Sequence, residues 1–129
     1  MRRLVLMIGM VMLIAVMATG VALAVTKTCS DIPCKGTDNE DVLHERHGSV
    51  RDRILAYGDH DILDANNYFN DRDVLRGDGG PDKLLANDRD GRDVLRGGKG
   101  RDSCYGDPGD AFVNCQVKST ALAAGLDVK

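Results

Sequence analysis

The chain repeats one short pattern eight times, in which an aspartate is followed two residues later by an apolar residue. Successive aspartates of the pattern lie 8 to 12 residues apart, and the steps from Asp41 to Asp61 to Asp82 are 20 and 21 residues. A period of this length is typical of solenoids, in which each repeat covers its neighbour. The chain is therefore expected to place a column of carboxylates beside a column of apolar side chains. The eight pairs are Asp41/Leu43, Asp52/Ile54, Asp61/Leu63, Asp73/Leu75, Asp82/Leu84, Asp93/Leu95, Asp102/Cys104 and Asp110/Phe112.

The residues between the aspartates predict short strands and tight turns. No apolar face recurs with the spacing of a helix. What recurs is a three-residue strand signal, as in residues 74–76 and 94–96, followed by a turn rich in Gly and Asp. Such residues favour turns over regular structure. The sequence therefore predicts an all-β repeat fold.

Three nine-residue units resemble a known repeat. They begin at Gly36, Gly77 and Gly97 and read GTDNEDVLH, GDGGPDKLL and GGKGRDSCY. They resemble the nonapeptide G-G-x-G-x-D-x-U-x of repeats-in-toxin (RTX, hemolysin-type) calcium-binding proteins, where U is a large apolar residue. The resemblance covers about residues 34–115 and implies a parallel β-roll, a solenoid of nonapeptide-like repeats.

The units depart from the consensus in two ways. Only the unit at Gly97 keeps all its glycines, and Asn39 stands where a glycine is expected. Between residues 45 and 70 the turns keep only Gly48 and Gly58. The number of calcium sites therefore stays open. Two or three additional residues also stand in the turns before Asp52, Asp73 and Asp93.

In a β-roll, two units make one coil, and stacked coils are about 4.8 Å apart. The apolar residue of each unit points inward, which predicts a thin core of two layers, and the aspartate lies at the rim. We expect Leu43, Leu63, Leu84 and Cys104 in one layer, and Ile54, Leu75, Leu95 and Phe112 in the other. We expect Asp41, Asp61, Asp82 and Asp102 at one edge, and Asp52, Asp73, Asp93 and Asp110 at the opposite edge.

A carboxylate column beside glycine-rich turns suits a hard cation. Calcium takes six to eight oxygens at roughly 2.3–2.6 Å, from carboxylates and carbonyls. The resemblance implies that aspartate carboxylates and turn carbonyls are the ligands, with the best-formed sites at residues 77–82 and 97–102. The alternative is that each aspartate only caps its turn by accepting N–H bonds. The expected ligand residues are Asp41, Asp52, Asp61, Asp73, Gly77, Asp78, Gly80, Asp82, Asp93, Gly97, Gly98, Gly100, Asp102 and Asp110, with Asp88 and Asp107 as secondary candidates.

The same features predict that ordering of the chain is coupled to calcium. Carboxylates a few ångströms apart repel one another, and one apolar residue per strand makes a small core. Calcium outside cells is close to the dissociation constants of weak extracellular sites, on the order of 10⁻⁴–10⁻³ M. Folding after export is therefore expected.

The ends of the chain predict export and two disulfides. Residues 1–24 have a basic start, an apolar middle and a small-x-small site, which is typical of a cleaved secretory signal peptide; an uncleaved membrane anchor is the alternative. Residues 25–33 are expected to form a short leader and residues 116–129 a tail. The four cysteines allow three connectivities. Cys29–Cys34 with Cys104–Cys115 is favoured, because each pair brackets one end of the array, while cysteine spacing and an oxidising compartment disfavour zinc.

Composition and motifs narrow the classes of function that the chain can have. Removal of residues 1–24 takes away two positive charges, Arg2 and Arg3, and lowers the formal net charge from −3 to −5, which argues against a nucleic-acid partner. No Gly-x-Ser-x-Gly or His-Glu-x-x-His motif is present, so no catalytic residue is expected. We expect a secreted, non-catalytic calcium-binding module with no membrane contact after cleavage. The alternative is an extracellular adhesion or matrix module, whose calcium-rigidified roll presents a face to an extracellular or cell-surface partner.

Overall fold

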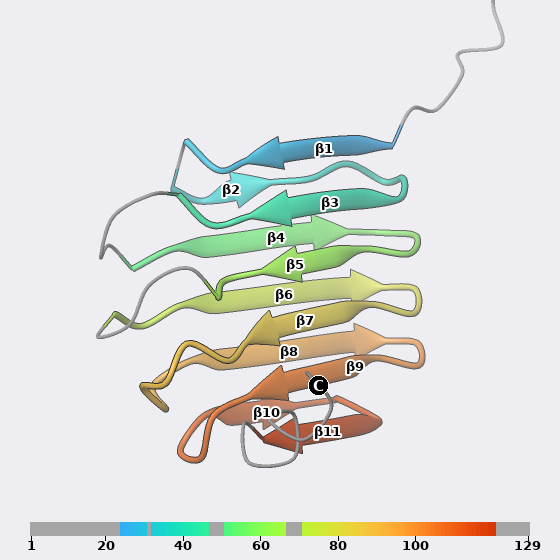
Figure 1. Cartoon of the computed structure of the whole chain (residues 1–129). Helices are drawn as coiled ribbons and strands as arrows, with labels where there is room; N and C mark the ends of the chain where they lie inside the picture. Colours follow the sequence, from blue (N-terminus) through green and yellow to red (C-terminus); the bar gives the residue numbers. More distant parts are fainter. Residues whose placement is uncertain (1–23, 31, 47–50, 67–70, 121–129) are drawn as a thin grey trace, which may run out of the picture.

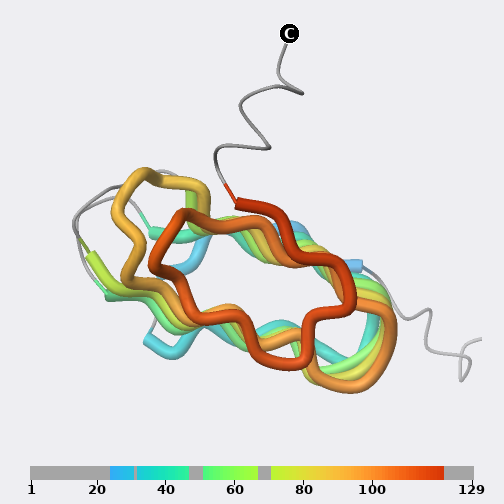
Figure 2. The backbone as a smooth tube through the Cα atoms, turned by 90° about the horizontal axis from the view of Figure 1, so that it is seen from below, coloured from blue at the N-terminus to red at the C-terminus, as the bar shows by residue number. Residues whose placement is uncertain are grey.

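The structure, a computed structural model, describes residues 24–30, 32–46, 51–66 and 71–120. Across these ranges the regular elements are all strands, and they wind into a stack of coils with parallel neighbours, from β1 at the top to β11 at the bottom of Figure 1. A view along the axis shows the coils superposed as a flattened tube (Figure 2). The all-β parallel solenoid predicted from the repeats is therefore confirmed. The predicted signal peptide lies outside the described residues except at its last position.

Two parallel sheets form the walls of the tube. Each full coil contributes one strand to each sheet, which is the pattern expected when two units make one coil. One sheet has six strands, in the order β1 (Val25–Thr28), β3 (Asp41–His44), β5 (Ile62–Asp64), β7 (Lys83–Ala86), β9 (Ser103–Gly106) and β11 (Val117–Thr120). The other has five, in the order β10 (Ala111–Val113), β8 (Val94–Lys99), β6 (Val74–Gly79), β4 (Arg53–Tyr57) and β2 (Cys34–Lys35).

The core lies between the sheets and consists of the two predicted layers. In the six-stranded sheet Leu63 pairs in register with Leu43 on one side and Leu84 on the other. In the five-stranded sheet Leu75 is flanked in the same way. The layers are Leu43, Leu63, Leu84 and Cys104, all fully buried, and Ile54, Leu75, Leu95 and Phe112, of which Phe112 is half-buried.

The turns differ between the two edges of the tube. The turns that lead from the five-stranded sheet into the six-stranded sheet are short and lie on the right in Figure 1; we call this side the short-turn edge. The turns back form the long-turn edge, and their described residues are 45–46, 51–52, 65–66, 71–73, 87–93 and 107–110. The aspartates alternate between the edges as predicted. Asp41, Asp61, Asp82 and Asp102 lie on the short-turn edge, and Asp52, Asp73, Asp93 and Asp110 on the long-turn edge.

The coil extends one strand beyond each end of the interval 34–115. Residues 25–28, expected in a leader, form β1 and pair with β3. Residues 117–120, expected in the tail, form β11 and pair with β9. The reason is that each terminal segment covers an otherwise open sheet edge. Both favoured disulfides, Cys29–Cys34 and Cys104–Cys115, are present and join these strands to the array.

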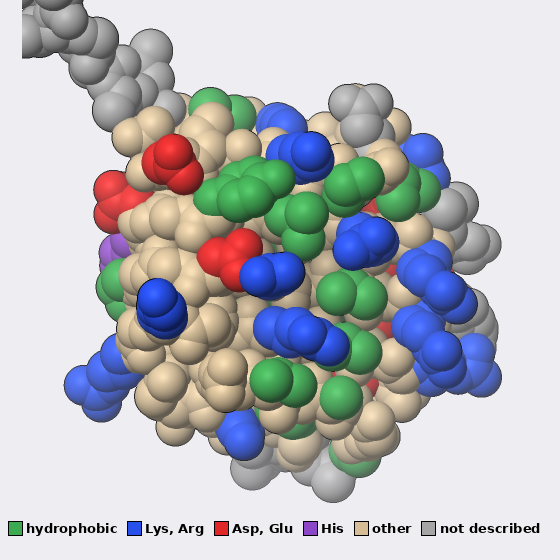
Figure 3. All heavy atoms as spheres, turned by 180° about the vertical axis from the view of Figure 1, so that it is seen from behind, with side chains coloured by type: hydrophobic (Ala, Val, Ile, Leu, Met, Phe, Trp, Pro, Cys, Tyr) green, Lys and Arg blue, Asp and Glu red, His purple; other side chains and the backbone are tan. Residues whose placement is uncertain are grey.

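The outer face of the five-stranded sheet carries rows of Lys and Arg side chains beside hydrophobic ones (Figure 3). A groove of about 430 Å³ crosses it. Val74 and Val94 are half-exposed on this face, and Val42 and Ile62 on the opposite sheet. The groove is lined by Arg51, Arg53, Leu55, Val74, Arg76 and Arg96. In the described ranges no helix is long and apolar enough to cross a membrane.

Candidate calcium site

A ladder of hydrogen bonds joins the aspartates of each edge from coil to coil. On the short-turn edge the N–H of Asp61 donates to the Asp82 carboxylate, and the N–H of Asp82 donates to the Asp102 carboxylate, both at 3.0 Å. On the long-turn edge the N–H of Asp73 donates to the Asp93 carboxylate at 2.7 Å. Each aspartate therefore caps the coil that precedes its own. The same bond joins Asp41 to Asp61, Asp52 to Asp73, and Asp93 to Asp110.

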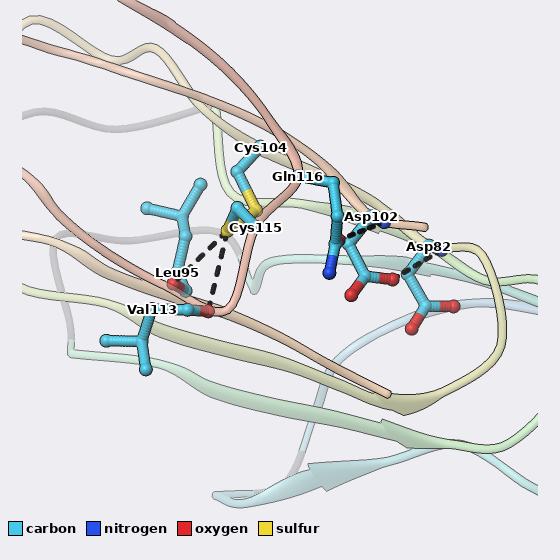
Figure 4. The surroundings of a disulfide bond; sticks show 7 residues. All are labelled: Asp82, Leu95, Asp102, Cys104, Val113, Cys115 and Gln116. Carbon is cyan, nitrogen blue, oxygen red and sulfur yellow. Dashed lines mark hydrogen bonds between the residues drawn. A yellow bond between two sulfur atoms is a disulfide. The ribbon is translucent and has the colours of Figure 1, made fainter. Parts of the chain in front are cut away.

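Gln116 takes the place of an aspartate in the last coil. The N–H of Asp102 donates to Gln116 Oε1 at 2.7 Å, beside the Cys104–Cys115 disulfide (Figure 4). A neutral amide oxygen can cap the coil but brings no negative charge. Sequence reasoning assigned Gln116 to the tail; its place directly after Cys115, at the end of the array, is the signal that could have identified it.

The second carboxylate oxygen of the ladder aspartates is buried without a partner. Asp61, Asp82 and Asp102 are 0–2% exposed, and within the described chain no hydrogen bond reaches Oδ2 of any of them. The same holds for Oδ2 of Asp73 and Asp93. A buried polar atom without a partner costs about 1–3 kcal/mol, and more when it is charged. Three such oxygens in register on the short-turn edge and two on the long-turn edge indicate a cationic ligand.

Glycines make room for that ligand on the short-turn edge. A methyl group added to Gly77 would meet the Asp82 carboxylate and lie 2.8 Å from the Gly97 carbonyl oxygen. One added to Gly97 would meet the Asp102 carboxylate and lie 2.5 Å from the Asn114 carbonyl oxygen. A free carboxylate oxygen and a carbonyl of the next coil thus border the same small space. These are the hard oxygen donors that calcium takes.

Backbone conformation confirms how the turns align with the nonapeptide. Tyr57, Asp78 and Gly98 stand in register at its second position, and all three have positive φ, at 91°, 75° and 115°. Gly80 and Gly100 have positive φ at the fourth position. Gly58, one of the two glycines kept in the degenerate region, follows Tyr57 at the third position, which needs no glycine. The non-glycine residues at the second position adopt a conformation that side chains normally disfavour.

The long-turn edge holds the largest number of carboxylates. Oxygens of Asp71, Asp88 and Asp90 lie within 4.8 Å of one another, as do those of Asp90, Asp93 and Asp110. Asp71, Asp90 and Glu45 were not expected as ligands from the sequence, since they lie outside the consensus positions. The signal that could have found them is the additional length of these turns, which sequence reasoning treated only as degeneracy.

Burial and mutual repulsion raise the pKa of these acids. Loss of hydration is the largest cause and raises the pKa of Asp82 to about 7, of Asp93 to about 8 and of Glu45 to about 8. The N–H bond from the preceding coil partly offsets this at Asp82 and Asp93. Neighbouring carboxylates raise the pKa further. The site therefore favours a positive charge, either protons or a metal ion.

The expected aspartate ligands differ in what their oxygens contact. Asp61, Asp73, Asp82, Asp93 and Asp102 each keep one free buried oxygen. At the outermost coils the second oxygen is occupied, because Asp41 accepts the Thr37 N–H at 2.5 Å and Asp110 accepts the Asp107 N–H at 2.6 Å. Asp78 is ion-paired with Arg76. Asp52, Asp88 and Asp107 each accept a backbone N–H, and Asp52 and Asp88 keep one free buried oxygen.

Comparison with known proteins identifies the repeat. Residues 86–113 match the family described as RTX calcium-binding nonapeptide repeat (4 copies). Searches of curated proteins and of solved structures gave no match. The matched segment contains β8, β9 and β10 and reaches both edges of the tube. Residues 86–113 therefore carry RTX calcium-binding nonapeptide repeats within a β-roll, and calcium is the ion that these repeats bind.

Proposed function

We propose that this protein is a secreted, non-catalytic calcium-binding module whose folding is coupled to calcium. Two rows of buried, unpartnered oxygens carry the proposal, one on Asp61, Asp82 and Asp102 and the other on Asp73 and Asp93. One oxygen of each carboxylate holds the coils together through the ladder, and the other is left for the ion. Turn carbonyls at residues 77–82 and 97–102 complete the proposed ligand sets.

Coupling to folding follows from the energetics of the empty roll. A buried carboxylate without a partner carries a desolvation penalty of several kcal/mol. The core that opposes this penalty has one large apolar side chain per strand. Calcium removes the penalty only in the folded state, where the oxygens converge, so its binding energy becomes folding energy. The basic, apolar and small-residue segments of residues 1–24 support export to a compartment rich in calcium.

Circular dichroism tests this proposal. Oxidised protein lacking residues 1–24 is titrated with calcium from zero to about 10 mM, a range that spans weak extracellular sites, with magnesium as the control ion. We expect a transition from coil to β-structure that calcium drives and magnesium does not. A β-spectrum unchanged by a chelator would show that the aspartates act only as caps.

A contact role is the second candidate, and the basic groove favours it. The groove places Arg51, Arg53, Arg76 and Arg96 on one face of a chain that is acidic overall. A calcium-rigidified sheet would hold these side chains at fixed spacing. Self-association or surface binding that requires calcium and is lost on R53E/R96E substitution would support this role, and a monomer indifferent to both would contradict it.

A further inference from the structure

The long turns carry carboxylates that the nonapeptide does not contain. Glu45 follows β3, Asp71 lies two residues before the ladder aspartate Asp73, and Asp88 and Asp90 lie within the turn that ends at Asp93. The structure brings residues from these three successive turns to one edge. Additional turn length, which reads as decay of the repeat in sequence, here adds acidic side chains to the interior of the edge.

The spacing of these carboxylates fits a calcium ion. The oxygens of Asp71, Asp88 and Asp90 lie within 4.8 Å of one another. Two oxygens on opposite sides of a calcium ion, each about 2.4 Å from it, are about 4.8 Å apart. Asp90 also belongs to the neighbouring group with Asp93 and Asp110. Two ions could therefore share the Asp90 carboxylate.

Buried oxygens without partners lie at this edge. Glu45 is 1% exposed, and both of its carboxylate oxygens lack a hydrogen bond in the described chain. The charges that act on it come from Asp52, Asp71, Asp73 and Asp88, all of them acidic. One oxygen of Asp71 and one of Asp88 are also buried and free. A buried carboxylate that has no hydrogen bond and has other carboxylates near it is explained by a cation at this edge.

None of the four acids from outside the nonapeptide forms an ion pair with a basic side chain of the described residues. Arg72 and Arg89, which alternate with the acids in these turns, are exposed. The two ion pairs found in the described ranges join His44 to Asp64 and Arg76 to Asp78, on the sheets.

Backbone hydrogen bonds hold the cluster in place before any ion arrives. The N–H of Asp71 donates to Asp90 at 3.0 Å, and the N–H of Asp90 donates to Asp88 at 3.2 Å. Gly91 packs against the Pro108 carbonyl of the next turn, with φ of 76°, where a larger side chain would collide. The donors thus fix the carboxylates without neutralising them, which preorganises the site.

We propose that the long-turn edge binds calcium in its own site, with Asp71, Asp88 and Asp90 as carboxylate ligands from outside the nonapeptide consensus and the buried Glu45 carboxylate adding negative charge at the same edge. This site rests on the proposed calcium-binding function, adds to the proposed short-turn sites and uses none of their residues. Three carboxylate ligands favour calcium over magnesium, because magnesium gives up its water shell reluctantly.

The test counts the calcium ions bound by the protein expressed from its full-length gene and recovered with both disulfides formed. Equilibrium dialysis with calcium alone compares wild type with E45Q, with D71N/D88N, and with the matched short-turn variant D82N/D102N. We expect D71N/D88N to bind at least one ion fewer than wild type, and E45Q to weaken binding at that site about tenfold or more. D82N/D102N should lose ions at the short-turn edge and keep those at the long-turn edge.

Two outcomes separate failure of this site from failure of the proposed function. If D71N/D88N and E45Q bind as many ions as wild type with unchanged affinity, the long-turn site is wrong and Glu45 is a buried protonated acid. If wild type binds no calcium, both proposals fail. Because loss of ions could follow from misfolding, far-UV circular dichroism at saturating calcium must show wild-type β-structure in each variant.

Discussion

The two carboxylate oxygens of Asp82 have different roles, and substitutions can separate these roles. Oδ1 accepts the Asp61 N–H at 3.0 Å, and Oδ2 is buried without a partner. Asp82→Asn keeps an acceptor oxygen for the ladder and removes the charge, whereas Asp82→Ala removes both. The two variants therefore predict different changes in the free energy of unfolding, with and without calcium.

The magnitudes follow from the contacts. Asp82→Ala leaves the Asp61 N–H unpaired, which lowers the unfolding free energy by about 1–3 kcal/mol in both states. Asp82→Asn should leave the calcium-free state no less stable than wild type at pH 8. At a calcium concentration 100 times the dissociation constant, one site adds about 2.7 kcal/mol, and a site weakened 100-fold adds only about 0.4 kcal/mol. Asp82→Asn should therefore lose about 2.3 kcal/mol in calcium alone.

Urea unfolding followed by circular dichroism measures these differences. The calcium-free samples contain an osmolyte such as TMAO, which favours the compact state enough to keep a folded baseline. Asp59→Asn is the matched control, because Asp59 is exposed on the same short-turn edge, in the turn of the neighbouring coil, and its φ of 73° suits asparagine. Equal losses for Asp82→Asn with calcium and with chelator would refute the reasoning, since the carboxylate would then be a cap alone.

Three further predictions follow from the same contacts. Burial raises the pKa of Asp82 from 3.8 to about 7 and that of Asp93 from 3.8 to about 8. Protons therefore stabilise the calcium-free fold at low pH, and this stabilisation is lost as the pH rises from about 4 to about 8. Circular dichroism should show more calcium-free β-structure at pH 5 than at pH 8, and the midpoint of the calcium titration should rise as the pH falls. Gly97→Ala should collide with the Asp102 carboxylate and the Asn114 carbonyl and weaken calcium binding, whereas Gly58→Ala, whose nearest atom would be 3.8 Å away, should not; equal calcium affinities in dialysis would contradict this. Replacing Cys104 and Cys115 by Ser opens a loop with a sequence separation of 11 and should cost about 3 kcal/mol in urea unfolding, and an unchanged midpoint would show that the last coil is held without the disulfide.

The sequence was sufficient for the fold because its period fixes the register. A residue such as Leu63 can stack on Leu43 and Leu84 only if the coils repeat every 20 or 21 residues, and the structure has that register. The ends were harder to predict. Residues 25–28 and Gln116 lack the Asp-x-apolar pattern, and they join the roll through backbone pairing and a cap, which depend little on side-chain type.

The candidate site was predictable only where it follows the consensus. The free oxygens of Asp82 and Asp102 lie in glycine-lined turns, as the motif implies. Glu45 and Asp71 escaped notice because turn length, and not motif position, brings them to the interior of the edge. Spacing along the chain cannot report how two turns of irregular length fold over each other.

Capping and metal binding, which the sequence presents as alternatives, are linked in the structure. The N–H bond from Asp61 orients the Asp82 carboxylate, and this orientation is what keeps its other oxygen in the turn beside Gly77. A freely rotating carboxylate could turn to water and lower its own energy, so without the ladder there would be no converging donors. Because every ladder bond spans two coils, an ion bound at one coil favours the geometry of the next. The empty roll is therefore penalised along its whole length, and calcium relieves that penalty coil by coil.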